Sequence, residues 1–95
     1  MPLFALVCLD KKDALEARMG AREAHLAYVD DHVHMVKVAG PFLDAEDKMI
    51  GSLFILEADD LIDAKAFAEE DPYAKAGVFE SADLRPFRVT RGGLK

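Results

Sequence analysis

The chain of 95 residues has a single cysteine, Cys8, so it cannot form a disulfide within itself. Free cysteines are among the residues most often buried. Cys8 lies in an apolar run near the N-terminus, where we expect a buried strand residue. Disulfides are rare in reducing compartments. The lack of a cysteine pair therefore fits a cytoplasmic protein.

The sequence also lacks a long hydrophobic segment. No run approaches the roughly 20 apolar residues that a helix needs to cross a bilayer. The first residues carry no basic region and lead directly into a predicted strand, so no signal peptide is expected. We therefore expect no membrane partner.

Basic residues are in the minority, with 12 Lys and Arg against 18 Asp and Glu and a net charge of −6. Binding to a phosphate backbone needs clustered Lys and Arg, so nucleic acid is not an expected partner. The chain is 52% hydrophobic and 32% charged, as soluble globular domains are. Its length predicts one domain over residues 1–95, with 91–95 as a flexible tail.

Signals for metal binding and for a nucleophilic serine are weak. His32 and His34 lie two residues apart without a cysteine or a clear carboxylate ligand nearby, so no metal is expected. Ser52, His25 and Asp71 would make a nucleophile set on paper. No glycine-flanked nucleophile elbow surrounds Ser52, which argues against serine-hydrolase chemistry.

Hydrophobic periodicity and turn residues divide the chain into six elements. Strands are predicted at 3–9, 33–39, 50–58 and 78–90, and helices at 11–32 and 59–70. Gly40-Pro41 is expected to end the second strand, before an exposed acidic loop at 42–49. The third strand is apolar on both faces and should be central. Pro86 favours an edge position or an irregularity in the last strand.

The order β-α-β-β-α-β predicts an α+β fold of the ferredoxin-like type, with an antiparallel sheet and two helices on one face. The other face of the sheet would remain uncovered. A symmetric homodimer that packs sheet on sheet would cover it.

On a helical wheel, the apolar residues of the first helix fall on one stripe, which we expect to be buried. This stripe consists of Leu15, Met19, Leu26 and Val29. Arg22 falls inside it, and Arg18 and His25 fall on its flank. A buried arginine needs a partner. Arg22 either pairs with a carboxylate such as Asp71 or forms part of an anion-holding cleft beside His25.

His25 and Asp71 each allow two interpretations. Histidine suits acid–base catalysis when a carboxylate orients it, although a lone histidine on a helix flank is more often a surface residue. Asp71 before Pro72 is a common helix-ending pair, because proline disfavours helical geometry in the preceding residue. Ser52 follows Gly51, which either permits a close approach or is ordinary strand sequence.

Several short segments, taken in order, resemble the YciI-like (YCII-related) proteins over nearly the whole chain. They are 15–18 (Leu-Glu-Ala-Arg), 22–26 (Arg-Glu-Ala-His-Leu), 39–41 (Ala-Gly-Pro), 51–52 (Gly-Ser), 64–65 (Ala-Lys), 71–73 (Asp-Pro-Tyr), 76–78 (Ala-Gly-Val) and 85–87 (Arg-Pro-Phe). The resemblance implies a ferredoxin-like fold that forms dimeric α+β barrels. It also implies an active site around His25 and Asp71, with Arg22, Ser52 and Tyr73 as substrate-binding residues.

The leading hypothesis is a homodimeric enzyme without metal or organic cofactor. His25 would move a proton on a small, anionic, cyclic or carbonyl-containing molecule, with Asp71 orienting the imidazole and Arg22 holding an oxygen. Elimination, isomerisation and hydrolysis are all compatible with these residues. The alternative is a metabolite-binding or accessory module without turnover. A third hypothesis is a relative of the monooxygenases or haem binders that form dimeric α+β barrels.

Overall fold

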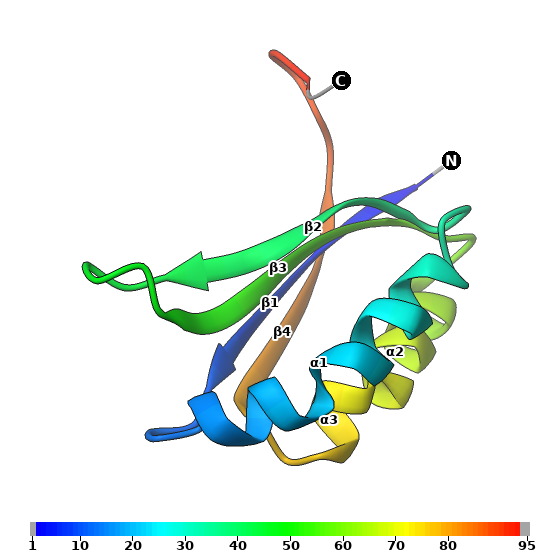
Figure 1. Cartoon of the computed structure of the whole chain (residues 1–95). Coiled ribbons are helices and arrows are strands. Elements are labelled where there is room, and N and C mark those ends of the chain that lie inside the picture. The colour runs from blue at the N-terminus through cyan, green and yellow to red at the C-terminus, as the bar shows by residue number, and fades with distance from the viewer. Residues whose placement is uncertain (1, 94–95) are drawn as a thin grey trace.

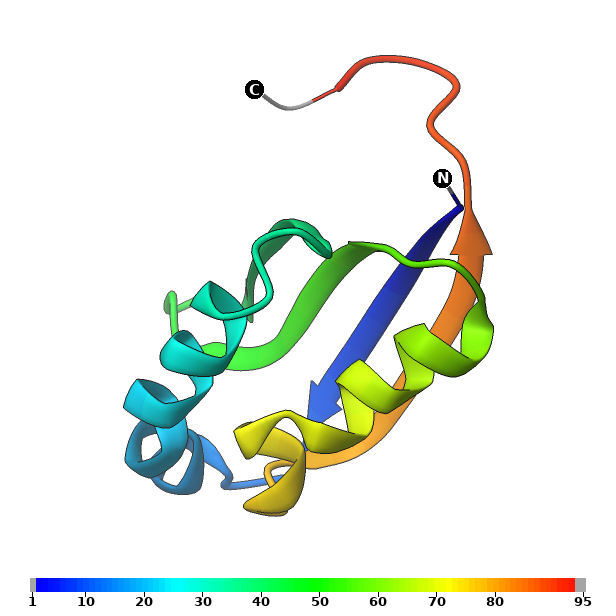
Figure 2. The same ribbon diagram turned by 90° about the vertical axis from the view of Figure 1, so that its right-hand side faces the viewer.

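The computed structural model describes residues 2–93. Its elements in chain order are β1 (Leu3–Asp10), α1 (Leu15–Asp30), β2 (Val36–Leu43), β3 (Met49–Glu57), α2 (Leu61–Glu70), α3 (Pro72–Lys75) and β4 (Phe79–Phe87). The strands form one sheet in the order β2-β3-β1-β4, and every neighbouring pair is antiparallel. Figures 1 and 2 show all three helices on the same face of this sheet. The predicted ferredoxin-like α+β fold is confirmed.

The core lies between the sheet and the helices. Alternate residues of β1 and β3 point toward the helices, because side chains alternate between the two faces of a strand. Phe4 and Leu6 of β1 are buried there against Phe54 and Leu56 of β3 and Phe67 of α2. β3 has a neighbour on each side and β4 has only one, so the predicted central and edge positions are confirmed.

The second strand begins and ends later in the chain than predicted. Residues 33–35 form a turn, so the predicted start at residue 33 is wrong. β2 continues through Gly40 and Pro41 to Leu43, so the predicted end at residue 39 is wrong. β2 is an edge strand, and proline is tolerated where one side of a strand makes no ladder hydrogen bonds. The loop that follows is short, and Asp44 closes it by accepting from the backbone N–H groups of Glu46 and Lys48 at 2.8 and 3.0 Å.

Two further details differ from prediction at the C-terminal end. The segment after Asp71 forms the short helix α3, with Pro72 in its first turn, where the missing N–H is not needed. The irregularity of β4 lies opposite the Leu9–Asp10 step of β1 and not at Pro86. Residues 88–93 belong to no strand (Figure 1). Residues 94 and 95 of the expected tail lie outside the described residues, and its flexibility stays a prediction.

The orientation of α1 was predicted wrongly. Leu15, Met19 and Leu26 are 38%, 50% and 44% exposed, and Val29 is half-buried. The helix instead buries Ala14 at its N-terminal boundary, Arg18 and His25. These positions recur at helical spacing too, and their polar groups find partners on other elements. Arg22 is exposed, so it does not lie inside a buried stripe.

None of the helices within residues 2–93 is long and apolar enough to span a membrane.

Candidate active site

His25 and Asp71 form a buried hydrogen-bonded pair. His25 Nδ1 lies 2.8 Å from Asp71 Oδ1, although 46 residues separate them. The same oxygen accepts the backbone N–H of Tyr73 at 3.0 Å and so caps α3. A carboxylate only accepts, so Nδ1 of His25 carries the proton. Nε2 makes no hydrogen bond with residues 2–93 and is therefore free to act on a ligand.

Aromatic rings hold the His25 imidazole in place. The Tyr73 ring stacks on it with centroids 3.9 Å apart and 12° between the planes. Phe54 of β3 approaches the imidazole edge-on, at 5.9 Å. Neighbours on two sides and the bond to Asp71 leave the imidazole one orientation, with Nδ1 facing Asp71.

Arg18, near the N-terminal end of α1, is buried against the end of β1. Its side chain is 2% exposed, and it forms a bidentate pair with Asp10 at the end of β1, with Nε–Oδ2 at 2.8 Å and Nη2–Oδ1 at 3.0 Å. Nη2 also donates to Ser52 Oγ at 2.7 Å. Burial disfavours the charged form, but the bond and charge of Asp10 outweigh it and raise the pKa of Arg18.

The same arginine supports the tyrosine that stacks on His25. Arg18 Cζ lies 4.5 Å from the Tyr73 ring centroid, in a cation–π contact. Arg18 and His25 are seven residues apart on α1, about 10 Å along the helix axis. The Tyr73 ring therefore lies between the two side chains. Burial raises the pKa of the Tyr73 hydroxyl, so the phenol stays protonated at neutral pH.

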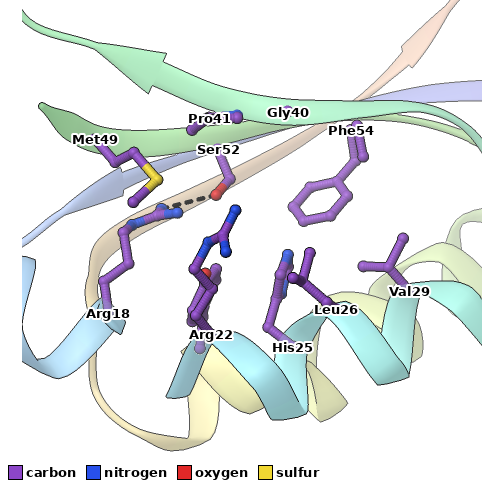
Figure 3. Close-up of a pocket in the computed structure, with 12 residues that line it drawn as sticks. Arg18, Arg22, His25, Leu26, Val29, Gly40, Pro41, Met49, Ser52 and Phe54 are labelled. Carbon is purple, nitrogen blue, oxygen red and sulfur yellow. Dashed lines mark hydrogen bonds between the residues drawn. The ribbon is translucent and has the colours of Figure 1, made fainter. Parts of the chain in front are cut away.

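A cavity of about 200 Å³ opens between α1 and the β2–β3 hairpin. Figure 3 shows Arg22 and His25 pointing from α1 toward the sheet, and Ser52 and Phe54 pointing from β3 toward the helix. Arg18 and Tyr73 also line the cavity, and apolar residues complete its lining: Leu26, Val29, Ala39, Gly40, Pro41 and Met49. The arrangement offers a few polar groups in an apolar enclosure, as small-molecule sites do.

Arg22 lies at this cavity without a protein partner. It makes no hydrogen bond or ion pair within residues 2–93, so the alternative in which it pairs with a carboxylate such as Asp71 is wrong. Asp71 accepts a hydrogen bond from His25 instead. An exposed guanidinium beside a cavity is available to bind an anionic oxygen.

Gly51 is required by the sheet. A Cβ atom at this position would lie 2.5 Å from the Cys8 carbonyl oxygen and 3.0 Å from the Phe42 ring. The small residue thus lets β3 and β1 approach each other. The following residue, Ser52, is 3% exposed and projects toward the helices, where it lines the cavity.

The five predicted site residues meet in one place. His25, Arg22, Ser52 and Tyr73 line the cavity, and Asp71 lies directly behind His25. Arg18 and Asp10 were missed as parts of this cluster. The sequence did contain a signal for this pair, because an aspartate ends a predicted buried strand and an arginine lies on the helix that follows. Only the structure, however, shows which face of that helix is buried.

Cys8 lies near the cluster but is not a nucleophile. Its thiol is buried, and burial together with the nearby Asp71 charge raises its pKa to about 12. The thiolate is the reactive form of cysteine, so Cys8 stays inert at neutral pH.

The described residues contain no group of three His, Cys, Asp or Glu side chains that could bind a metal. His32 directs Nδ1 to the Tyr28 carbonyl oxygen at 2.6 Å, and its ring centroid lies 6.1 Å from that of His34. The two histidines are therefore not arranged as a ligand pair.

Sequence comparison places these features in a family. The model of the YCII-related domain matches residues 2–88. The chain belongs to the YCII-related domain family. Protein YciI of Escherichia coli O6:H1 is 37% identical in an alignment that covers 90% of this chain and 96% of that one.

Solved structures agree with the YCII assignment. The 5-chloro-2-hydroxyhydroquinone dehydrochlorinase of Burkholderia phenoliruptrix AC1100, in complex with 2,5-dihydroxybenzoquinone, is 32% identical with a TM-score of 0.86. The alignment covers 90% of this chain and 93% of that chain. A protein of Bacteroides thetaiotaomicron named "putative antibiotic biosynthesis monooxygenase" is 14% identical with a TM-score of 0.61. The alignment covers 99% of this chain and 93% of that chain, and it shows the shared fold alone.

Proposed function

We propose that this YCII-family protein is an enzyme that transfers a proton on a small, anionic organic molecule, with His25 as the catalytic base and acid. The observation that carries the proposal is the buried bond of 2.8 Å between His25 Nδ1 and Asp71 Oδ1, which leaves Nε2 free beside the cavity. A histidine oriented by a carboxylate in this way is a common arrangement for general acid–base catalysis.

In the proposed reaction, Nε2 of His25 takes a proton from a C–H or O–H group of the substrate. From a C–H group the electron pair moves onto the neighbouring carbonyl oxygen, and from an O–H group it stays on the oxygen that lost the proton. Arg22 holds the resulting enolate oxygen. The Asp71 carboxylate stabilises the imidazolium that forms. Return of the proton at another atom gives isomerisation, and loss of a leaving group gives elimination. If water is the proton donor, the same base supports hydrolysis.

The size and lining of the cavity support a small substrate. A cavity of ~150 Å³ holds a benzene molecule, so about 200 Å³ suits a single substituted ring or a short chain. The dehydrochlorinase of similar structure was solved with 2,5-dihydroxybenzoquinone, a ring of this size with acidic hydroxyl groups. This molecule is therefore a reasonable first probe.

The proposal includes a homodimer. The sheet face turned away from the helices carries Val7 beside Leu53 and Ala5 beside Ile55, all half-buried, and Leu9, which is exposed. A second copy packed on this face would cover them. Sedimentation at micromolar concentration should give twice the mass of the chain, and a monomer would contradict the dimer.

The free thiol of Cys8 supports a reducing, cytoplasmic location.

The test compares His25→Gln with the wild-type protein. A panel of small enolisable acids and hydroxyquinones is incubated in D₂O, and proton exchange or turnover is followed by NMR. We expect His25→Gln to abolish the reaction of any substrate that the wild type turns over. Unchanged turnover would remove His25 from the mechanism.

A binding module without turnover is the competing function, favoured by the unpaired Arg22 at the cavity. Asp71→Asn separates the two. In the enzyme, loss of the carboxylate charge lowers the rate far more than the affinity for substrate. A loss confined to affinity would favour the binding module.

A further inference from the structure

The buried ion pair of Arg18 and Asp10 adds little to the stability of the fold. Removing two charges from water costs several kcal/mol per ion, and apolar residues of similar volume often pack as well. The function of the pair therefore lies in the residues that it contacts. Both side chains are nearly inaccessible, at 2% and 5% exposure, and the bidentate geometry allows the guanidinium one position.

This fixed guanidinium determines the role of Ser52. Arginine has only donor groups, so the bond of 2.7 Å from Nη2 requires the Ser52 oxygen to accept. The Ser52 hydroxyl makes no other hydrogen bond within residues 2–93. Its own proton points away from Arg18, and the residue lines the cavity. Ser52 thus has a donor without a protein partner in the described chain, on a side chain that is only 3% exposed.

On the opposite side of the cavity, His25 presents a hydrogen-bond acceptor. Its Nδ1 proton is bound by Asp71, so neutral His25 presents the lone pair of Nε2. Figure 3 shows His25 on the helix side and Ser52 on the sheet side of the same cavity. An acceptor therefore faces a donor across a space large enough for one small molecule.

We propose that Ser52 is a specificity residue that donates to a carbonyl or enolate oxygen of the ligand, and that Arg18 and Asp10 are positioning residues that enforce this role. The inference rests on the proposed function and names its substrate class, a molecule with an acidic proton on one side and an oxygen acceptor on the other. The Arg18 charge polarises the hydroxyl through their hydrogen bond. Its donation strengthens as negative charge develops on the ligand oxygen.

The test is a double-mutant cycle with 2,5-dihydroxybenzoquinone as the probe, using calorimetry for affinity. Ser52→Ala removes one hydrogen bond to the ligand and should weaken binding about 10-fold. Asp10→Asn loosens Arg18 and should weaken binding by a similar factor. Because both act on one bond, the double variant should also lose about 10-fold. A loss near 100-fold would mean independent effects and would overturn the positioning role.

A spectroscopic readout separates positioning from a merely structural effect. A hydrogen bond to a carbonyl lowers its stretching frequency, so the infrared band of the bound probe should rise equally in Ser52→Ala and in Asp10→Asn. If Asp10→Asn does not fold by circular dichroism, Arg18→Lys replaces it, because lysine cannot hold both partners in the same geometry. Arg85→Gln, on the exposed outer part of β4, is the control and should bind like the wild type.

The outcomes distinguish this inference from the proposed function. If His25→Gln abolishes binding while Ser52→Ala binds like the wild type, the donor role of Ser52 is wrong and the proposed function stands. If neither variant changes binding, the probe does not use this cavity and the proposed function fails. A wild-type protein that does not bind the probe at millimolar concentration would overturn both.

Discussion

Replacing Asp71 by alanine should destabilise the protein about 2 kcal/mol more than replacing Asp60. Both aspartates cap a helix: Asp60 accepts from the backbone N–H of Asp63 at 2.9 Å, and Asp71 accepts from that of Tyr73 at 3.0 Å. Loss of a cap costs ~1 kcal/mol in either case. Asp60 makes its bond at the surface and so supplies a matched control.

The excess arises from the second partner of Asp71. Without the carboxylate, the Nδ1–H group of His25 is buried and unpaired, which costs roughly 1–3 kcal/mol. One contribution opposes this cost, because Asp71 Oδ2 is buried without a partner in the described chain and its removal is favourable. We take ~2 kcal/mol as the net difference.

Urea unfolding followed by circular dichroism measures both variants at neutral pH, provided that the slopes agree. The double variant Asp71→Ala, His25→Ala should recover part of the lost stability, since it also removes the unpaired Nδ1–H donor of His25. Equal destabilisation by Asp71→Ala and Asp60→Ala would refute the reasoning. It would mean that the His25–Asp71 bond contributes nothing and that Asp71 is only a cap.

Three further predictions concern Gly51 and Cys8. Gly51→Ala should lower the free energy of unfolding by ~1–3 kcal/mol, because its Cβ would lie 2.5 Å from the Cys8 carbonyl oxygen. Gly40→Ala is the control, since a Cβ at Gly40 would have no atom within 4 Å. Similar free energies of unfolding for the two variants in urea would contradict the close approach of β1 and β3. The protein should lose stability between pH 9 and about 12, because the buried Cys8 thiol keeps a proton that the unfolded thiol, with an ordinary pKa near 9, releases. Burial also raises the pKa of Tyr28 to about 12, which adds to this loss above pH 10. Cys8→Ala should show a shallower decline of the urea midpoint over this range, and an unchanged slope would show that the thiol is not responsible. A thiol reagent should leave Cys8 of the native protein unmodified at neutral pH and react only after unfolding; fast reaction without urea would contradict its burial.

Local patterns in the sequence were sufficient for the fold. The apolar run of β3 predicted a central strand, and Pro86 predicted an edge strand, because each depends on hydrogen bonding and burial within one segment. The extent of β2 was missed because the tolerance of an edge strand for Pro41 depends on its position in the sheet. That position follows from the order of all four strands.

The site was harder to predict, and α1 shows why. Apolar residues suggested that one face was buried, but Arg18 and His25 occupy the buried face. Each is stabilised there by a carboxylate outside α1, Asp10 and Asp71, respectively. No local sequence pattern indicates that a residue of α1 pairs with a carboxylate from another element. The resemblance to YCII-related proteins selected His25 and Asp71 correctly as neighbours, whereas the role of Arg18 became visible only from its contacts.

The position of the proton on the His25 imidazole decides whether His25 can act as the base, and measuring it requires no substrate. In protein labelled with ¹⁵N-histidine, and with His25→Gln to assign the signals, NMR distinguishes protonated from unprotonated ring nitrogens. We expect neutral His25 to carry its proton on Nδ1, bound to Asp71, and to leave Nε2 unprotonated at the cavity. A proton found on Nε2 would contradict this expectation, because His25 would then face the cavity as a donor and could not act as the base.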